Sequence, residues 1–101
     1  MKQLTRGFRE PGVDKAASAF RQDVFHYSKA WPREERYAMT DQVRRSSPSV
    51  GAHLAEAGAK REYPAHFLCK LTDADGELQE TLHWLQTAAE CGYVTRMTSF
   101  R

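Results

Sequence analysis

The stretch from Pro64 to Cys91 constrains the fold most, because its apolar residues recur with the spacing of one face of a long helix. Successive apolar positions lie 4, 3, 4, 4, 3 and 4 residues apart, close to the seam of a helical bundle. Gly92 stands where a glycine often ends a helix. We therefore expect a helix over 62–91 that packs against other helices. Its apolar positions are Phe67, Leu71, Ala74, Leu78, Leu82, Leu85 and Ala89, widened by Leu68, Thr81 and Ala88.

Two further helices are predicted before it. The first runs over 13–30 and closes at Trp31-Pro32, because the residue before a proline disfavours the α conformation. The second runs over 33–57, and Pro48 inside it predicts a kink near 48–51 through the loss of one backbone hydrogen bond. Residues 1–12 are expected to form an extended lead-in. The expected interior positions are Ala16, Phe20, Val24, Tyr27 and Trp31 on the first helix, and Tyr37, Met39, Val43, Val50 and Leu54 on the second.

The composition agrees with an all-α fold in a single domain, 1–101. Only six glycines and four prolines occur among 101 residues, which disfavours a turn-rich β architecture. The hydrophobic fraction of 41% and the charged fraction of 28% are those of a globular chain rather than a disordered one. We expect an up-and-down arrangement of antiparallel helices.

The sequence points to the cytoplasm. It contains no apolar run near the ~20 residues that span a bilayer, and its first residues lack the apolar segment of a secretory signal. Cys69 and Cys91 fall on one predicted helix, roughly 33 Å apart along its axis, whereas a disulfide needs Cα atoms within about 7 Å. We expect two free thiols that pack in the interior, and no membrane partner.

No constellation of catalytic residues stands out. His53 and Glu56 lie three residues apart on one helical face, but a di-iron bundle needs two such pairs and further carboxylates. Cys91 and His83 lack a third, orienting group, and no phosphate-binding glycine loop occurs. We expect no enzymatic activity, metal, cofactor or small-molecule substrate. A metal or acid–base site at His53 and Glu56 remains the alternative.

Charge is distributed unevenly along the chain. Residues 1–61 carry a net charge of +5 and residues 62–101 a net charge of −3. A basic half attracts phosphate backbones or a partner's acidic face, although an uneven solvated surface is the simpler interpretation. Arg45 also has Asp41 four residues before it as an ordinary surface partner. The candidate residues for nucleic-acid contact are Arg33, Arg36, Arg44, Arg45, Lys60 and Arg61.

Two segments resemble a known family. The stretch WPREERYAMTDQVRRS, from Trp31 to Ser46, resembles the signature of the four-helix-bundle proteins of the 23S rRNA intervening-sequence family. The following SVGAHLAEA, from Ser49 to Ala57, is similar to that family's Ser-Ile-Pro-x-Asn-Ile-Ala-Glu-Gly segment. The resemblance extends from about Phe8 to the Cys-Gly-Tyr-Val sequence that ends at Val94. This chain departs from the pattern at Pro11, Asp14, Gly51, His53 and Ala57.

The resemblance implies an up-and-down bundle of the four-helix type that assembles as a homopentamer. It also implies a relation to the accessory protein of diversity-generating retroelements, a pentamer with a nucleic-acid-binding surface, and it implies no enzymatic activity. We expect the fourth helix to be short or missing in this chain. Some of the four leucines Leu71, Leu78, Leu82 and Leu85 should then be under-covered in an isolated subunit.

Two functions remain open from the sequence. The first is a non-catalytic, self-associating helical bundle of unknown cellular role that binds copies of itself, and RNA or DNA through a basic surface. The alternative is a protein-directed adaptor or antitoxin-like interaction module that binds no nucleic acid.

Overall fold

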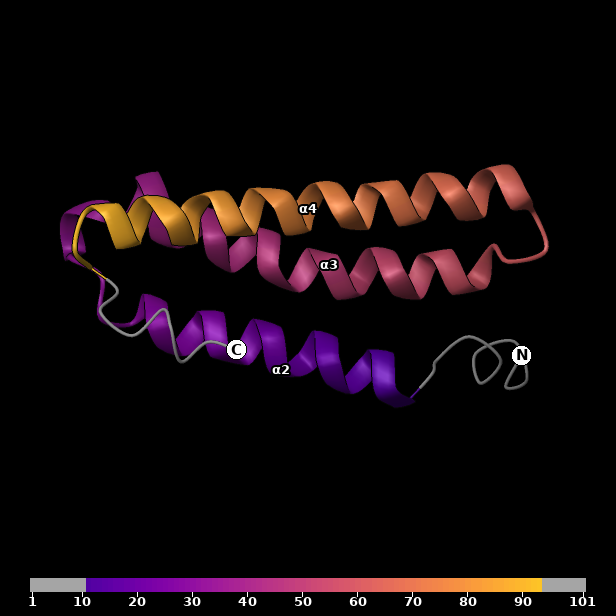
Figure 1. The fold of residues 1–101 in the computed structure, drawn as a ribbon, viewed down its shortest axis with the longest axis horizontal. Helices are drawn as coiled ribbons and strands as arrows, with labels where there is room; N and C mark the ends of the chain where they lie inside the picture. Colours follow the sequence, from indigo (N-terminus) through magenta and orange to yellow (C-terminus); the bar gives the residue numbers. More distant parts are fainter. Residues whose placement is uncertain (1–10, 94–101) are drawn as a thin grey trace.

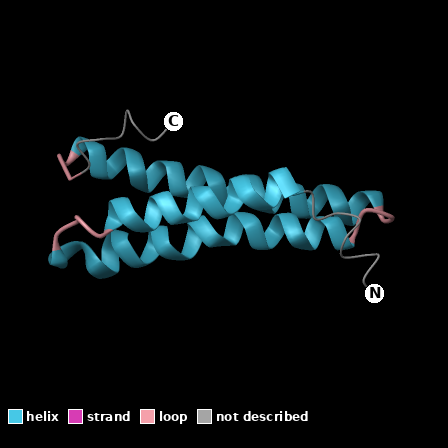
Figure 2. Cartoon of the chain, turned by 90° about the horizontal axis from the view of Figure 1, so that it is seen from below, coloured by secondary structure: helices cyan, strands magenta, loops and turns pink. Residues whose placement is uncertain are grey.

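The computed structural model describes residues 11–93, a range that contains three α-helices and no strand. The helices lie lengthwise beside one another, and each runs antiparallel to the one before it (Figures 1 and 2). The middle helix packs against both of the others. An all-α fold is therefore confirmed, whereas the region where a fourth helix would begin lies outside the described residues. The elements are α2 (Pro11–Ser28), the short 3₁₀ helix η1 (Arg33–Glu35), the π-helix η2 (Arg36–Thr40), α3 (Asp41–Ala59) and α4 (Pro64–Glu90).

Helix α2 begins and ends two residues earlier than the predicted helix over 13–30. The extended lead-in predicted for residues 1–12 is wrong at its last two positions, which are helical, and residues 1–10 lie outside the described range. After Ser28 the backbone tightens, and the Trp31 N–H donates to the Ser28 carbonyl over 3.2 Å. Trp31 is buried at this turn, so the chain reverses around an aromatic anchor.

The helix predicted over 33–57 is irregular at its beginning rather than at its middle. Residues 33–40 form η1 and η2, and a regular helix begins only at Asp41 and continues to Ala59. Pro48 lies within α3, which continues unbroken from Asp41 to Ala59, so the helix does not end at the position where a kink was predicted. The Pro48 side chain is exposed, so its ring does not disturb the core. The loss of one N–H donor is then tolerated in a helix that α2 and α4 support.

The core lies at the end of the molecule where α2, η2 and the last turns of α4 meet. Its buried members come from all three regions and include one large aromatic side chain. Tyr37, which we expected in the interior, is instead 75% exposed. The partly buried aromatic residues around the core come from both outer helices and the chain after α4. The buried cluster consists of Val24, Trp31, Met39, Val43, Leu85 and Ala88, surrounded by Phe20, Tyr27, Trp84 and Tyr93.

The ends of α4 agree with the prediction to within two residues at the start and one at the end. Pro64 occupies the first turn, where its missing N–H costs nothing. At the other end, Gly92 adopts a φ of 81°. The Gly92 N–H donates to Ala89 over 3.0 Å and the Tyr93 N–H to Ala88 over 2.9 Å. These two bonds form a Schellman motif and confirm the helix-ending role of the glycine.

The buried stripe of α4 is rotated relative to the predicted one. Its buried residues are Ala74, Thr81, Leu85 and Ala88. Leu82 is 43% exposed and Leu68 is 61% exposed, and Ala89 is exposed as well. The rotation has a physical cause in the small hydroxyl side chains of Ser46 and Thr81, which bond over 2.7 Å and bring α3 close to that side of α4. We predicted that some of the four leucines on α4 would be incompletely covered. Leu82 is exposed, Leu71 and Leu78 are half-buried, and Leu85 is buried.

Candidate functional site

The six predicted phosphate-binding residues do not form one patch. Arg33 and Arg36 precede α3, whereas Lys60 and Arg61 follow it. A helix of 19 residues spans about 28 Å, so these two groups lie at opposite ends of α3. The remaining two candidates, Arg44 and Arg45, lie in the first turns of α3 and differ in their surroundings.

Arg45 is held between α3 and α4. Its Nη2 lies 2.6 Å from Glu80 Oε1, and its Nη1 lies 3.3 Å from Glu77 Oε1. Hydrogen bonds to Glu80 and then Glu77 raise the pKa of the Arg45 guanidinium. The bond from Arg45, followed by one from the Trp84 indole, lowers the pKa of Glu80. An ion pair does absorb Arg45, but its partners are on α4 rather than at Asp41.

The same interhelical network includes the His53 and Glu56 pair. His53 Nδ1 lies 3.3 Å from Glu56 Oε1, and His53 Nε2 lies 3.8 Å from Glu77 Oε2. Lys70 Nζ approaches Glu56 to 3.0 Å and lowers the pKa of its carboxyl group. Across residues 11–93 no group of three or more His, Cys, Asp or Glu side chains is arranged to hold a metal ion. The pair therefore belongs to an ion-pair network that links α3 to α4.

Arg44 points toward α2 instead. Its Nε donates to Ser28 Oγ over 2.8 Å, and the Ser28 hydroxyl in turn donates to the Phe25 carbonyl over 2.9 Å. The guanidinium carbon lies 4.5 Å from the centroid of the Phe25 ring, within the range of a cation–π contact. Lys29 Nζ lies 5.0 Å from the same ring. Arg44 is thus fixed in position while its two Nη groups make no hydrogen bond in the described part of the chain.

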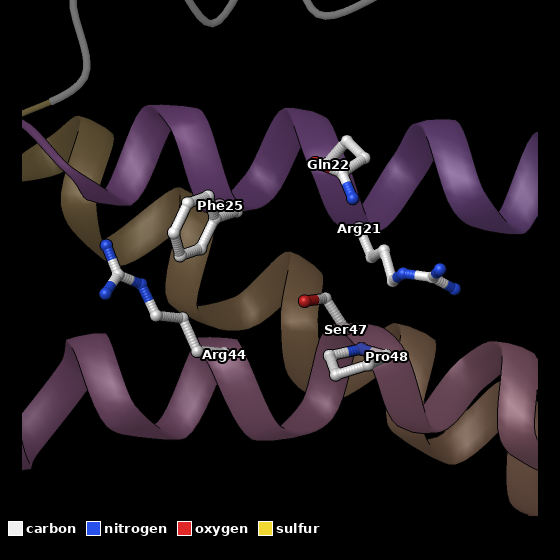
Figure 3. A pocket seen from close by; sticks show the side chains of 6 residues that line it. All are labelled: Arg21, Gln22, Phe25, Arg44, Ser47 and Pro48. Carbon is white, nitrogen blue, oxygen red and sulfur yellow. The ribbon is translucent and has the colours of Figure 1, made fainter.

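A pocket of about 270 Å³ opens beside Arg44, between α2 and α3. Arg44 and Arg21 lie toward opposite ends of it with their guanidinium groups turned away from each other, and the Ser47 side chain stands between them with its hydroxyl on the side of Phe25 and Arg44 (Figure 3). Ser47 is only 3% exposed. Neither arginine makes an ion pair with another residue of the 11–93 range. The lining residues are Arg21, Gln22, Phe25, Arg44, Ser47 and Pro48.

Sequence reasoning identified Arg44 but missed Arg21, Phe25, Lys29 and Ser47. The missed signal is the spacing of four residues between Arg21, Phe25 and Lys29, which places them on one face of α2. A search for clustered basic residues does not detect this spacing. The position of Ser47 beside that face depends on how α2 and α3 are rotated against each other, which no local pattern specifies.

The two cysteines lie on the surface of the protein. Cys69 and Cys91 are both free and both exposed. The prediction of free thiols is confirmed, and the prediction that they pack in the interior is wrong. In the part of the chain that the structure describes, no helix combines the length and apolar character needed to cross a membrane.

Comparison with known proteins identifies a family. No curated protein and no solved structure matches the chain. A family model described as the 23S rRNA-intervening sequence protein matches residues 10–100, a range that includes all of α2 to α4 and both segments on which the sequence resemblance rests. The chain therefore belongs to the 23S rRNA-intervening sequence protein family.

Proposed function

We propose that this protein is a non-catalytic, self-associating helical bundle of the cytoplasm that binds the phosphate backbone of RNA or DNA. The observation that carries the proposal is the separation of its charges. The acidic side chains between α3 and α4 are paired with Arg45, Lys70 and His53. In contrast, no ion pair within residues 11–93 includes the arginines that lie on the α2–α3 side and before α3, namely Arg21, Arg33, Arg36 and Arg44.

Unpaired arginines suit phosphate contact because the guanidinium group offers several N–H donors to phosphate oxygens without reading a base. Each such contact also releases counterions, so binding weakens as salt increases. Arg33 and Arg36 are exposed and need no rearrangement to reach a ligand. Assembly of several copies multiplies a modest charge per subunit.

Self-association is supported by the outer surface of α4. Leu68 and Leu82 are exposed, and Leu71 and Leu78 are only half-buried. Apolar side chains that gather on one surface mark interaction sites more often than single exposed leucines do. We propose that copies of the chain cover this surface in a homo-oligomer, and that the oligomer is the pentamer implied by the family resemblance.

A salt titration of RNA binding tests the nucleic-acid proposal. The double variant Arg33→Gln/Arg36→Gln should bind a generic single-stranded RNA more weakly and with a shallower dependence on salt. The matched control is Arg45→Gln/Lys70→Gln, which removes the same charge from two residues that already have carboxylate partners. RNA binding that is unmeasurable at low salt, or that both double variants weaken equally, contradicts the proposal.

One observation favours the protein-directed alternative. Tyr37 is 75% exposed, and the guanidinium carbon of Arg36 lies 5.7 Å from its ring centroid. Tyrosine and arginine are enriched among the residues that dominate protein–protein binding. This function predicts that a protein partner co-purifies, while the 260/280 nm absorbance ratio shows no nucleic acid. A ratio raised by bound nucleic acid, and restored by a high-salt wash, favours the first function.

A further inference from the structure

We propose that the pocket between α2 and α3 is an oxyanion site that takes a phosphate group, with Arg44, Arg21 and Ser47 as its binding residues. The inference deepens the proposed nucleic-acid function and rests on it where the phosphate belongs to RNA. Free phosphate offers the same oxygen acceptors, so the two sources share one chemistry.

Arg44 is held ready for such a ligand. Its Nε is committed to Ser28, and its plane is packed near Phe25, so little conformational freedom remains to be lost on binding. Both Nη groups keep their N–H donors. The residue is also half-buried, and a partly desolvated charge without a counter-ion is unfavourable. An anion in the pocket would relieve that cost.

Ser47 contributes a hydroxyl to the lining of the pocket. The residue is only 3% exposed, and its hydroxyl makes no hydrogen bond to another of residues 11–93, but the oxygen is not among the fully buried side-chain atoms that lack a partner. The side chain stands between the two arginines, with its hydroxyl on the side of Arg44 (Figure 3). A hydroxyl that reaches the pocket without a partner in this part of the chain is available to donate to a phosphate oxygen.

The described lining of the pocket contains no carboxylate. Its polar residues are two arginines, an amide and a hydroxyl. Asp14 and Arg21 line an adjoining hollow, and Asp14 does not line the pocket itself. Asp41, three residues before Arg44, is exposed and makes no ion pair with it. The local field therefore favours an anion.

The pocket has room for a phosphate group and offers no free aromatic platform for a base. Its volume is about 270 Å³. The Phe25 ring already has Arg44 and Lys29 near it, at 4.5 and 5.0 Å, so it does not offer a free platform for a nucleobase. The site would contact the backbone and carry no sequence preference.

The experiment uses the full chain labelled with ¹⁵N and two probes. Inorganic phosphate is titrated at constant ionic strength, with chloride as the reference anion, while the Arg Nε–H signals and the Ser47 amide are followed by NMR. A single-stranded RNA is then titrated by fluorescence anisotropy. The pocket variants are Arg21→Gln, Arg44→Lys and Ser47→Ala. The matched control is Lys15→Gln, which removes one charge from an exposed position of α2 outside the pocket.

Phosphate should shift the Arg21, Arg44 and Ser47 signals, and Arg21→Gln should weaken RNA binding about tenfold, as expected for one lost charged hydrogen bond. Lys15→Gln should change RNA binding far less. Arg44→Lys keeps the positive charge but removes the planar guanidinium group with its paired N–H donors, and Ser47→Ala keeps all charges. Weaker RNA binding by either variant therefore shows that the site depends on hydrogen-bond geometry as well as on charge. Circular dichroism melting of each variant verifies that it is folded.

The outcomes separate the inference from the proposed function. If RNA binds but phosphate gives no localised shifts and Arg21→Gln behaves like Lys15→Gln, the pocket inference is overturned and the proposed function stands. If no RNA binds at low salt, yet phosphate shifts the pocket signals and Ser47→Ala abolishes those shifts, the proposed function is overturned and the oxyanion site is supported. Loss of both responses overturns both.

Discussion

The hydroxyl groups of Ser46 and Thr81 meet inside the contact between α3 and α4, where neither side chain reaches solvent. Thr81 Oγ1 donates to the Glu77 carbonyl over 2.9 Å, which leaves Ser46 Oγ as the donor of the 2.7 Å bond between the two hydroxyls. Each of these two buried hydroxyls then has a partner. Among residues 11–93, the only other side-chain hydrogen bond of Ser46 is a 3.5 Å contact with the Val43 carbonyl, so the pair depends on Thr81.

Thr81→Val should therefore lower the free energy of unfolding by about 1–3 kcal/mol, because it leaves the Ser46 hydroxyl buried without a good acceptor. The double variant Thr81→Val/Ser46→Ala should lose less than the sum of the two single variants. Urea unfolding followed by circular dichroism measures all three. Strict additivity would show that the two hydroxyls do not interact.

Tyr93 makes the other residue-scale contact with a measurable signature. Its hydroxyl donates to Glu35 Oε2 over 2.6 Å and joins the end of α4 to η1. The bond to Glu35, with some desolvation and the charge of the same carboxylate, raises the pKa of Tyr93 to about 12. Since the folded pKa exceeds the ordinary value near 10, this stabilisation is complete below pH 10 and is lost as the pH rises toward 12.

An ultraviolet titration of phenolate absorbance should show one tyrosine ionising near pH 12. Tyr93→Phe should remove that component, and Glu35→Gln should move it back toward pH 10, because the neutral amide does not oppose the phenolate. Tyr37→Phe, at an exposed position, is the control and should leave it unchanged. A high component that persists in Tyr93→Phe would assign the shift to another residue.

At the scale of the elements, α2 and α3 approach each other closely at Gly51 and Ala17, where the side chains are small. A Cβ atom added to Gly51 would lie 3.3 Å from the Cβ of Ala17. Other small residues, Ser18, Ala52 and Ala55, line the same side of the two helices. The short side chains of Gly51 and Ala17 thus serve a packing role between α2 and α3.

Gly51→Leu should destabilise the protein by about 1–3 kcal/mol, because the larger side chain forces α2 away from α3. Gly76 provides the matched control, because it is exposed on α4 and a Cβ atom added there would have no neighbour within 4 Å. Gly76→Leu should gain some of the roughly 0.8–1 kcal/mol by which glycine disfavours a helix. Thermal unfolding compares the two. Equal stability of both variants would mean that α2 is not packed tightly at Gly51.

The elements illustrate which features can be read from local sequence. Three helices, the proline at the start of α4 and the ending role of Gly92 follow from periodicity and backbone chemistry, and the structure has them. The π-helical turn of η2 and the rotation of α4 depend on contacts between segments distant in sequence. Arg45 shows the same limit for the site, because its partners Glu77 and Glu80 are 32 and 35 residues away.

For the whole molecule, the sequence correctly indicated that the apolar seam of α4 exceeds what two neighbouring helices cover, but it did not identify the uncovered positions. Leu85 is buried and Leu82 is exposed because α3 approaches α4 at Thr81. The face of α4 that α3 covers is therefore rotated by part of a turn from the predicted one. Leu68 and Leu82 lie 14 residues apart, two heptads along one side of the helix. An interface on this side would run along much of α4.

Light scattering in solution tests that interface directly. The wild-type chain should have the mass of several copies, and Leu82→Glu should shift it toward a single subunit, because a carboxylate buried in an apolar contact without a partner is strongly unfavourable. Ala19→Glu adds the same charge at an exposed position of α2, outside the α4 surface, and should leave the mass unchanged. A wild-type monomer would contradict both self-association and the argument that assembly multiplies the basic charge. Nucleic-acid contact would then rest on the unpaired arginines of one subunit alone.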